Sequence, residues 1–154
     1  MSNDVVTNTN SRPVVRVARS DESVPMPKQG HHTDAGFDLS STVRLDIPPG
    51  CSMLVGTGLY MEIPEGWGGQ INPRSGMASK YKVTIGARII DSSYRGEVMI
   101  NLINNVHDTF EVTKGMRVAQ ILFIPVLTDM EEIDMSELTT TARGKGGFGS
   151  TGEK

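Results

Sequence analysis

The stretch Gly86-Ala87-Arg88-Ile89-Ile90-Asp91-Ser92-Ser93-Tyr94-Arg95-Gly96-Glu97 carries the pattern from which the fold and the chemistry are inferred. A run of apolar residues ends in an acid, and two serines then turn the chain toward an aromatic residue, an arginine and a glycine. A second strand-like run at 98–103 follows directly. This pattern predicts a β-hairpin with the carboxylate of Asp91 and the phenol of Tyr94 near its bend. Asp91 is therefore the first candidate for a chemical role.

The rest of the composition favours short strands joined by turns. The chain has 154 residues, including 17 glycines and 8 prolines, and 37% of it is hydrophobic. That length suits one domain with its own core. The frequent turn residues favour an all-β sandwich or closed barrel. Strand-like runs lie at 14–19, 43–47, 51–63, 109–112 and 116–126, and we interpret the run at 51–63 as two strands around Gly56-Thr57-Gly58.

Charge and cysteine content exclude several classes of function. The net charge of −3 gives no general attraction to nucleic acid or to an anionic membrane. No apolar run approaches the length of a membrane span, and the first residues carry neither a basic leader nor an apolar segment. Cys51 is the single cysteine, which excludes an internal disulfide. We therefore expect a cytoplasmic protein without nucleic-acid or membrane partners.

Three further stretches carry candidate chemistry, and each also has a purely structural interpretation. In Pro73-Arg74-Ser75-Gly76-Met77-Ala78, a short helix capped by Ser75 would offer an anion cradle. The structural alternative for this stretch is a simple capped turn with an exposed Arg74. Asp38, two residues after Gly36, is either a local backbone acceptor or an acid that meets a metal. Gln120 lies in the most apolar run, 116–126, which is expected to be buried on both faces and to contact another subunit. A buried amide there needs a partner.

The C-terminal residues 142–152 are rich in glycine and contain Arg143 and Phe148. The glycine spacing formally matches a dinucleotide fingerprint and nearly matches a phosphate loop. Both matches fail because no strand precedes them and the loop lysine is missing. What remains is either a disordered tail or a flexible arm. Such an arm would place Arg143 and backbone amides on phosphate and stack Phe148 on a base.

Together these stretches resemble the trimeric dUTP pyrophosphatases (dUTPases), because all five motifs of that family occur in order. They are Ala35-Gly36-Phe37-Asp38-Leu39, Pro73-Arg74-Ser75-Gly76-Met77-Ala78, Ile90-Asp91-Ser92-Ser93-Tyr94-Arg95-Gly96, Arg117-Val118-Ala119-Gln120-Ile121 and Arg143-Gly144-Lys145-Gly146-Gly147-Phe148-Gly149-Ser150-Thr151-Gly152.

The resemblance implies an all-β, distorted jelly-roll barrel or sandwich with one short helix, assembling as a homotrimer. Residues 1–12 would be a disordered N-terminal segment, 13–138 the jelly-roll domain, and 139–154 a flexible arm. Three shared active sites would each use the first, second and fourth motifs of one subunit and the third motif of a neighbour. The arm of the remaining subunit would close each site.

The resemblance also implies the reaction and its residues. The protein would hydrolyse dUTP to dUMP and pyrophosphate with Mg²⁺, which keeps uracil out of DNA and supplies dUMP for nucleotide metabolism. Asp91 would be the general base, Tyr94 would exclude a 2′-hydroxyl, and Asp38 would orient the magnesium ion through water. The other implied substrate-binding residues are Arg74, Ser75 and Gly76 for the phosphates, Ile85, Ile89, Ile90 and Met99 for the uracil, Gln120 for the phosphate or water network, and Arg143, Phe148, Ser150 and Thr151 from the arm.

Two departures and two rival functions accompany this resemblance. Arg88 stands where the family commonly has glycine, and Ser93 replaces a residue that is often acidic. The related dCTP deaminases have a glutamate where this chain has Asn101, and a second serine where it has Gly76, which argues against deamination. A non-catalytic jelly-roll module, structural or nucleotide-sensing, is the second alternative, and removal of the chain from Arg143 onward would distinguish it from a hydrolase.

Overall fold

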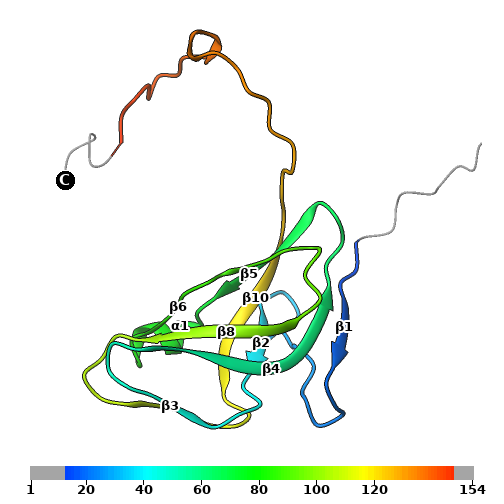
Figure 1. The fold of residues 1–154 in the computed structure, drawn as a ribbon, viewed down its shortest axis with the longest axis vertical. Coiled ribbons are helices and arrows are strands. Elements are labelled where there is room, and N and C mark those ends of the chain that lie inside the picture. The colour runs from blue at the N-terminus through cyan, green and yellow to red at the C-terminus, as the bar shows by residue number, and fades with distance from the viewer. Residues whose placement is uncertain (1–12, 148–154) are drawn as a thin grey trace, which may run out of the picture.

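Two four-stranded antiparallel sheets form the body of the protein in the computed structural model, which describes residues 13–147 (Figure 1). The first sheet has the order β1 (Arg16–Arg19), β4 (Ser52–Glu62), β8 (Glu97–Asn104), β6 (Val83–Ile85). The second has the order β2 (Phe37–Ser40), β10 (Arg117–Pro125), β5 (Trp67–Asn72), β7 (Ile89–Ile90). A third, two-stranded sheet joins β3 (Leu45–Ile47) to β9 (Phe110–Val112). The all-β prediction is confirmed.

The core lies between the two larger sheets. In β8, every second residue is buried, namely Val98, Ile100, Leu102 and Asn104. The residues between them are half-buried, as the alternation of side chains along a strand requires. Their counterparts on the second sheet include Leu39, Ile71 and Ile121, each of which is at most 1% exposed. One apolar cluster thus unites both sheets.

The predicted hairpin around Asp91 is wrong in its pairing. Residues 89 and 90 form β7, which pairs with β5 in the second sheet, whereas β8 pairs with β4 and β6 in the first. The chain leaves β6 at Gly86, whose amide donates to the Asn101 carbonyl (2.9 Å), and crosses to the other sheet. The turn after Asp91 therefore connects the two sheets at their edge. The run at 51–63 is likewise one strand, not two, because Gly56-Thr57-Gly58 is an irregularity within β4.

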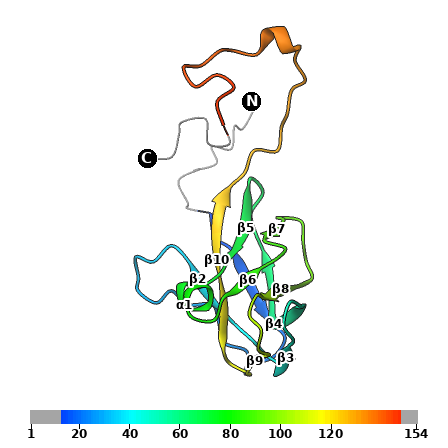
Figure 2. The same cartoon turned by 90° about the vertical axis from the view of Figure 1, so that its left-hand side faces the viewer.

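The single α-helix of residues 13–147 is α1 (Ser75–Ser79), which follows β5, and Figure 2 shows it at the side of the sandwich near β2 and β6. A 3₁₀ helix, η1 (Met135–Glu137), lies in the segment that follows β10. That segment runs away from the sheets, as both ribbon views show. None of the helices in the described part of the chain is long and apolar enough to cross a membrane.

Candidate active site

An open polar pocket of about 890 Å³ lies where the loop before β2, the end of β5, the start of α1 and strand β10 meet. All five site residues predicted from the first, second and fourth motifs line it, together with several of their neighbours. Its walls are Gly30, Asp34, Ala35, Gly36, Asp38, Gln70, Asn72, Arg74, Ser75, Gly76, Arg117, Gln120 and Leu122. The structure thus brings Asp38, Arg74, Ser75, Gly76 and Gln120 to one place, although the sequence separates them by up to 82 residues (120 − 38).

Asp38 is the centre of the charges in this pocket. Its Oδ1 accepts a hydrogen bond from Nε of Arg74 (2.8 Å), and its Oδ2 accepts one from Nη1 of Arg117 (3.1 Å). The carboxylate is mostly buried, with its side chain 17% exposed, whereas the two arginines are 31% and 57% exposed. Charge-assisted bonds of this kind are short and directional. Asp38 therefore orients two guanidinium groups at the pocket, and an anionic ligand is the natural complement.

The side chain of Gln120 is polar but lies in an apolar strand, where it has a hydrogen-bond partner. Its Nε2 donates to the carbonyl oxygen of Pro73 (3.1 Å), one residue before Arg74. The side chain also lies so close to Gly36 that a Cβ there would be 3.0 Å from Cδ of Gln120. Strand register places Gln120 opposite Asp38 on β2 and opposite Asn72 on β5. Gln120 thus joins the first and second motifs from the strand between them.

The backbone at the start of α1 is open toward the pocket. Arg74 is the N-cap, in an extended conformation and without a side-chain cap, so the prediction that Ser75 caps the helix is wrong. Ser75 is instead the first helical residue, and its carbonyl accepts a hydrogen bond from Oγ of Ser79 (2.7 Å). A Cβ at Gly76 would meet no atom within 4 Å. A ligand can therefore approach this backbone closely.

Asp91 and Tyr94 lie elsewhere on the chain and do not line the pocket. Asp91 follows β7, is exposed, and begins a turn in which its carbonyl accepts the Tyr94 amide (3.1 Å). The Tyr94 hydroxyl donates to the Glu97 carbonyl (2.9 Å), and the ring covers Gly96, where a Cβ would be 2.6 Å from Cζ. Within one chain, the candidate base and the anion pocket are thus separate halves.

The residues predicted to read a base belong to three different strands. Ile89 and Ile90 form β7, with Ile89 exposed and Ile90 packed against the core. Ile85 ends β6, and Met99 lies on β8 opposite Gly56; both are half-buried. None of the four lines the polar pocket.

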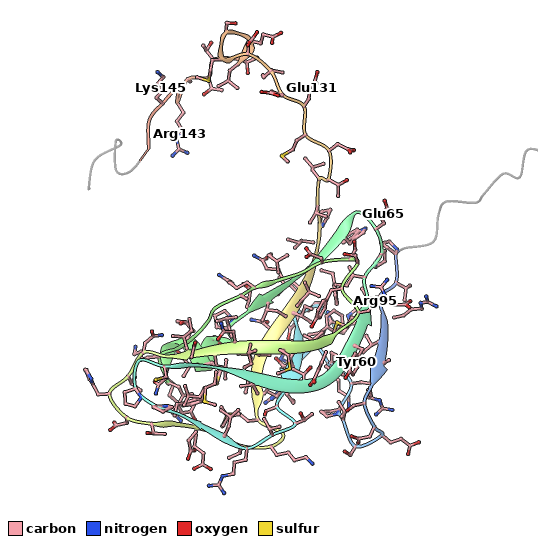
Figure 3. All side chains as sticks on the ribbon, in the orientation of Figure 1. Tyr60, Glu65, Arg95, Glu131, Arg143 and Lys145 are labelled. Atoms are coloured by element: carbon pink, nitrogen blue, oxygen red, sulfur yellow. The ribbon has the colours of Figure 1, made fainter. Side chains whose placement is uncertain are left out.

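Among the C-terminal candidates, Arg143 is the one within the described residues, and it lies remote from both halves of the site. Arg143 lies on the segment beyond β10, well away from the sheets (Figure 3), and its Nε donates to the Gly146 carbonyl (2.9 Å). Phe148, Ser150 and Thr151 lie outside the described residues.

The polar or charged pocket residues that were not among the predicted site residues are Asp34, Gln70, Asn72 and Arg117. Arg117 had a signal, since it opens the same stretch that contains Gln120. Asn72 directly precedes the Pro73-Arg74-Ser75 stretch, but an asparagine beside a proline is a common turn signal. Asp34 lies three residues after His31, whose amide donates to Oδ2 of Asp34 (2.8 Å), and shares the bend of the loop before β2.

Comparison with known proteins places this arrangement in a family. The family model described as dUTPase matches residues 22–152. The chain is 43% identical over 141 residues to the deoxyuridine 5′-triphosphate nucleotidohydrolase of Gloeothece citriformis, covering 90% of this chain and 96% of that protein. It is also 43% identical over 150 residues to the protein of the same name from Corynebacterium jeikeium, covering 94% and 96%.

Solved structures agree on the fold. The dUTPase of Staphylococcus bacteriophage 80alpha, solved with dUPNHPP, superposes with a TM-score of 0.84 at 26% identity and covers 91% of this chain and 99% of that one. A mutant dUTPase from phage phi11 of S. aureus, described as revealing the coordination of a structural Mg(II) ion, superposes with a TM-score of 0.75 at 26% identity, covering 81% and 99%. The two sheets described above are thus the jelly roll of these enzymes, and the chain belongs to the dUTPase family.

Proposed function

We infer that this protein hydrolyses dUTP to dUMP and pyrophosphate, by attack of water on the α-phosphorus. The observation that carries this inference is the polar pocket in which Asp38 holds Arg74 and Arg117 beside the open backbone of α1, in a chain of the dUTPase family. A triphosphate carries several negative charges, and two oriented guanidinium groups with nearby amides are suited to hold them. The cellular consequence is removal of dUTP, which keeps uracil out of DNA and supplies dUMP.

The reaction requires little covalent chemistry from the protein. The water oxygen forms a bond to the α-phosphorus, the bond from that phosphorus to the bridging oxygen of the β-phosphate breaks, and pyrophosphate leaves with the electron pair. Asp91 accepts the proton of the attacking water as general base, a role typically worth about 10²–10⁴ in rate. Arg74, Ser75 and Gly76 bind the phosphates, and Gln120 fixes the position of this segment through Pro73.

Recognition of the nucleoside is assigned to the edge between the sheets. The ring of Tyr94, held over Gly96 by its bond to the Glu97 carbonyl, would lie under the deoxyribose and leave no room for a 2′-hydroxyl. Backbone groups of Ile89 and Ile90, with Ile85 and Met99 nearby, would read the uracil edge. The exposed position of Ile89 at the outer edge of β7 supports this assignment, because its outer backbone groups have no strand partner within residues 13–147.

Magnesium fits this site as a companion of the substrate. The described residues contain no group of three His, Cys, Asp or Glu side chains that would hold a metal by themselves. Mg²⁺ commonly binds through one or two carboxylates, water and substrate phosphates, and Asp38 is a carboxylate in the pocket that can serve through water. When bound, the ion would neutralise phosphate charge and polarise the α-phosphate. The two bonds from arginines that Asp38 already accepts favour contact through water over direct ligation.

We propose a homotrimer with sites shared between subunits. Two features of one chain support it: Asp91 and the anion pocket are separate, and apolar side chains are left in solvent. Leu127 and Met130 in the segment after β10 are each 99% exposed. An apolar groove of about 630 Å³ beside β1, lined in part by Val15, Trp67 and Phe123, is a second surface that association would cover.

Complementation between inactive variants tests the shared site. Asp91→Asn and Arg74→Ala are each expected to be nearly inactive. If a site takes Arg74 from one copy and Asp91 from another, random assortment in a one-to-one mixed trimer leaves about a quarter of the sites with both native residues. Recovery of activity on co-expression supports sharing. No recovery in a mixed trimer would show that both residues act from the same copy.

We also propose that residues 139–154 act as an arm that closes a neighbour's site, with Arg143, Phe148, Ser150 and Thr151 on the phosphates and the base. Support comes from the position of Arg143, which lies well away from the sheets of its own chain (Figure 3). Closure over a substrate excludes bulk water from the site, apart from the attacking water molecule.

Pyrophosphate release is the direct test of the function. The purified protein should release pyrophosphate from dUTP far faster than from dTTP, dCTP or UTP, and chelation of magnesium should slow the reaction. Ammonia release from dCTP would instead support the deaminase alternative. No release from any of the four nucleotides would favour a non-catalytic module.

A further inference from the structure

Arg88 makes contacts that connect two parts of the site. It lies just before β7, and its backbone carbonyl accepts the amide of Ile71 on β5 (2.7 Å), which extends the β5–β7 pairing by one residue. Its side chain then folds back over the same strand. Nε donates to the Ile71 carbonyl (3.0 Å), and Nη2 donates to Oδ1 of Asn72. The guanidinium group therefore spans the last two residues of β5.

The last residue of β5 directly precedes the phosphate-binding segment. Asn72 lines the polar pocket, and Pro73 and Arg74 follow it. The other side of this junction is held by Gln120, which pairs with Asn72 in the sheet and donates to the Pro73 carbonyl. Arg88 and Gln120 thus hold the exit of β5 from its two neighbouring strands. The exit direction of β5 sets where Arg74 and the open backbone of Ser75 and Gly76 lie.

We propose that Arg88 is a positioning residue for the phosphate-binding segment, acting through Asn72. The inference rests on the proposed function, because it assigns phosphate binding to residues 74–76. A glycine at position 88 would keep the backbone bond to Ile71 but lose both side-chain bonds. β7 would keep its pairing with Gly69 and Gln70, so the nucleoside-reading edge would be preserved. The loss should therefore fall on phosphate affinity alone.

Two ligands separate these effects: a non-hydrolysable dUTP analogue, which carries phosphates, and deoxyuridine, which carries none. Arg88→Gly and Asn72→Ala should each weaken binding of the analogue by about three- to tenfold, the size expected for one or two partly exposed hydrogen bonds. The affinity of the double variant for the analogue should be at most about twofold below that of the single variant with the lower affinity, since both substitutions remove the same contact. Deoxyuridine affinity should stay within about twofold of wild type.

Charge alone is a competing explanation, and two variants control for it. Arg88→Lys keeps the charge but cannot span both acceptors, so it should bind the analogue better than Arg88→Gly and less well than wild type. Arg44→Gly removes another exposed arginine, which pairs with Glu111 and does not line the pocket, and should leave both affinities unchanged. Full recovery in Arg88→Lys, or an equal loss in Arg44→Gly, would overturn the proposal in favour of a general charge effect.

Hydrogen exchange gives a readout that needs no ligand. In the ligand-free protein, Arg88→Gly should speed amide exchange at residues 74–76 relative to the β8 core. Unchanged exchange there, an unchanged analogue affinity in Asn72→Ala, or equal weakening of analogue and deoxyuridine would each contradict positioning through Asn72. A wild-type protein that binds neither ligand would refute the proposed function instead, and the exchange experiment would still test the junction.

Discussion

Replacement of Gly96 by alanine should separate substrate selectivity from stability. A Cβ at this position would lie 2.6 Å from Cζ and 2.9 Å from Cε2 of Tyr94, and closer still to the hydroxyl oxygen. Ordinary carbon–carbon contacts are about 3.5–4.0 Å, so the ring must move outward by about 1 Å. Tyr94 is 42% exposed and has room to do so.

The cost to folding should be small. The displaced ring loses its hydrogen bond to the Glu97 carbonyl (2.9 Å), worth about 0.5–1.5 kcal/mol. Replacing glycine with alanine returns about 0.4–1 kcal/mol through the unfolded state where the backbone accepts it. The net loss should therefore be about 1 kcal/mol or less, which lowers the Tm by no more than about 2–4 °C in a domain of this size.

The cost to selectivity should be much larger. If Tyr94 leaves no room for a 2′-hydroxyl, a displacement of about 1 Å opens that space and misplaces the sugar, and misplacement of this size can cost about 10²-fold. The ratio of kcat/KM for dUTP to that for UTP should therefore fall at least tenfold in Gly96→Ala. Tyr94→Phe is the matched control: it loses the same hydrogen bond but keeps the ring in place, and should retain most of the ratio. A wild-type ratio in Gly96→Ala would refute the role of the Tyr94 ring in excluding the 2′-hydroxyl.

Three other predictions concern the core, the arm and acid stability. Leu102→Ala removes a fully buried side chain of β8 and should lower the free energy of unfolding by about 2–5 kcal/mol in a denaturant titration, whereas Val14→Ala at an exposed position should have little effect. Ending the chain before Arg143 should remove most dUTP hydrolysis with no change in Tm, since the hydrogen bonds of residues 143–147 are local; retained activity would contradict the arm. Asp21 accepts hydrogen bonds from Ser23, which lower its pKa below 3.8, so its stabilisation is present above the unfolded pKa and lost as pH falls through the folded value; Asp21→Asn should flatten that acid limb of the Tm profile.

Strand positions followed from alternation and turn residues, but strand partners did not. Side-chain alternation with a period of two residues predicts that 89–90 and 98–103 are extended. It does not predict which strand each of them pairs with. Pairing was decided by the core. Gly86, which leaves no room for a Cβ beside Asn101, lets the chain leave β6 and carry Ile89 and Ile90 to the second sheet. Similarly, Gly56 and Gly58 looked like a turn because glycines in a strand and in a turn give the same local signal.

The composition of the pocket was largely predictable, while its electrostatics were not. Asp38, Arg74, Ser75, Gly76 and Gln120 were identified from the motifs and do line one pocket. That Asp38 holds both Arg74 and Arg117 depends on two strands and a helix start meeting in space, which no local pattern encodes. Assignment of Asp91 to the same site needs a second copy of the chain, and that remains a prediction.

The role of Asp91 as the general base for hydrolysis of dUTP can be tested with a single variant. Asp91→Asn keeps the size of the side chain but cannot accept a proton at neutral pH, and Asp91 is exposed, so the fold should not depend on its charge. Affinity for a non-hydrolysable dUTP analogue should stay within about twofold, while the single-turnover rate of pyrophosphate release should fall by about 10²–10⁴. Release at the wild-type rate with the analogue still bound would contradict the assignment of Asp91 as the base.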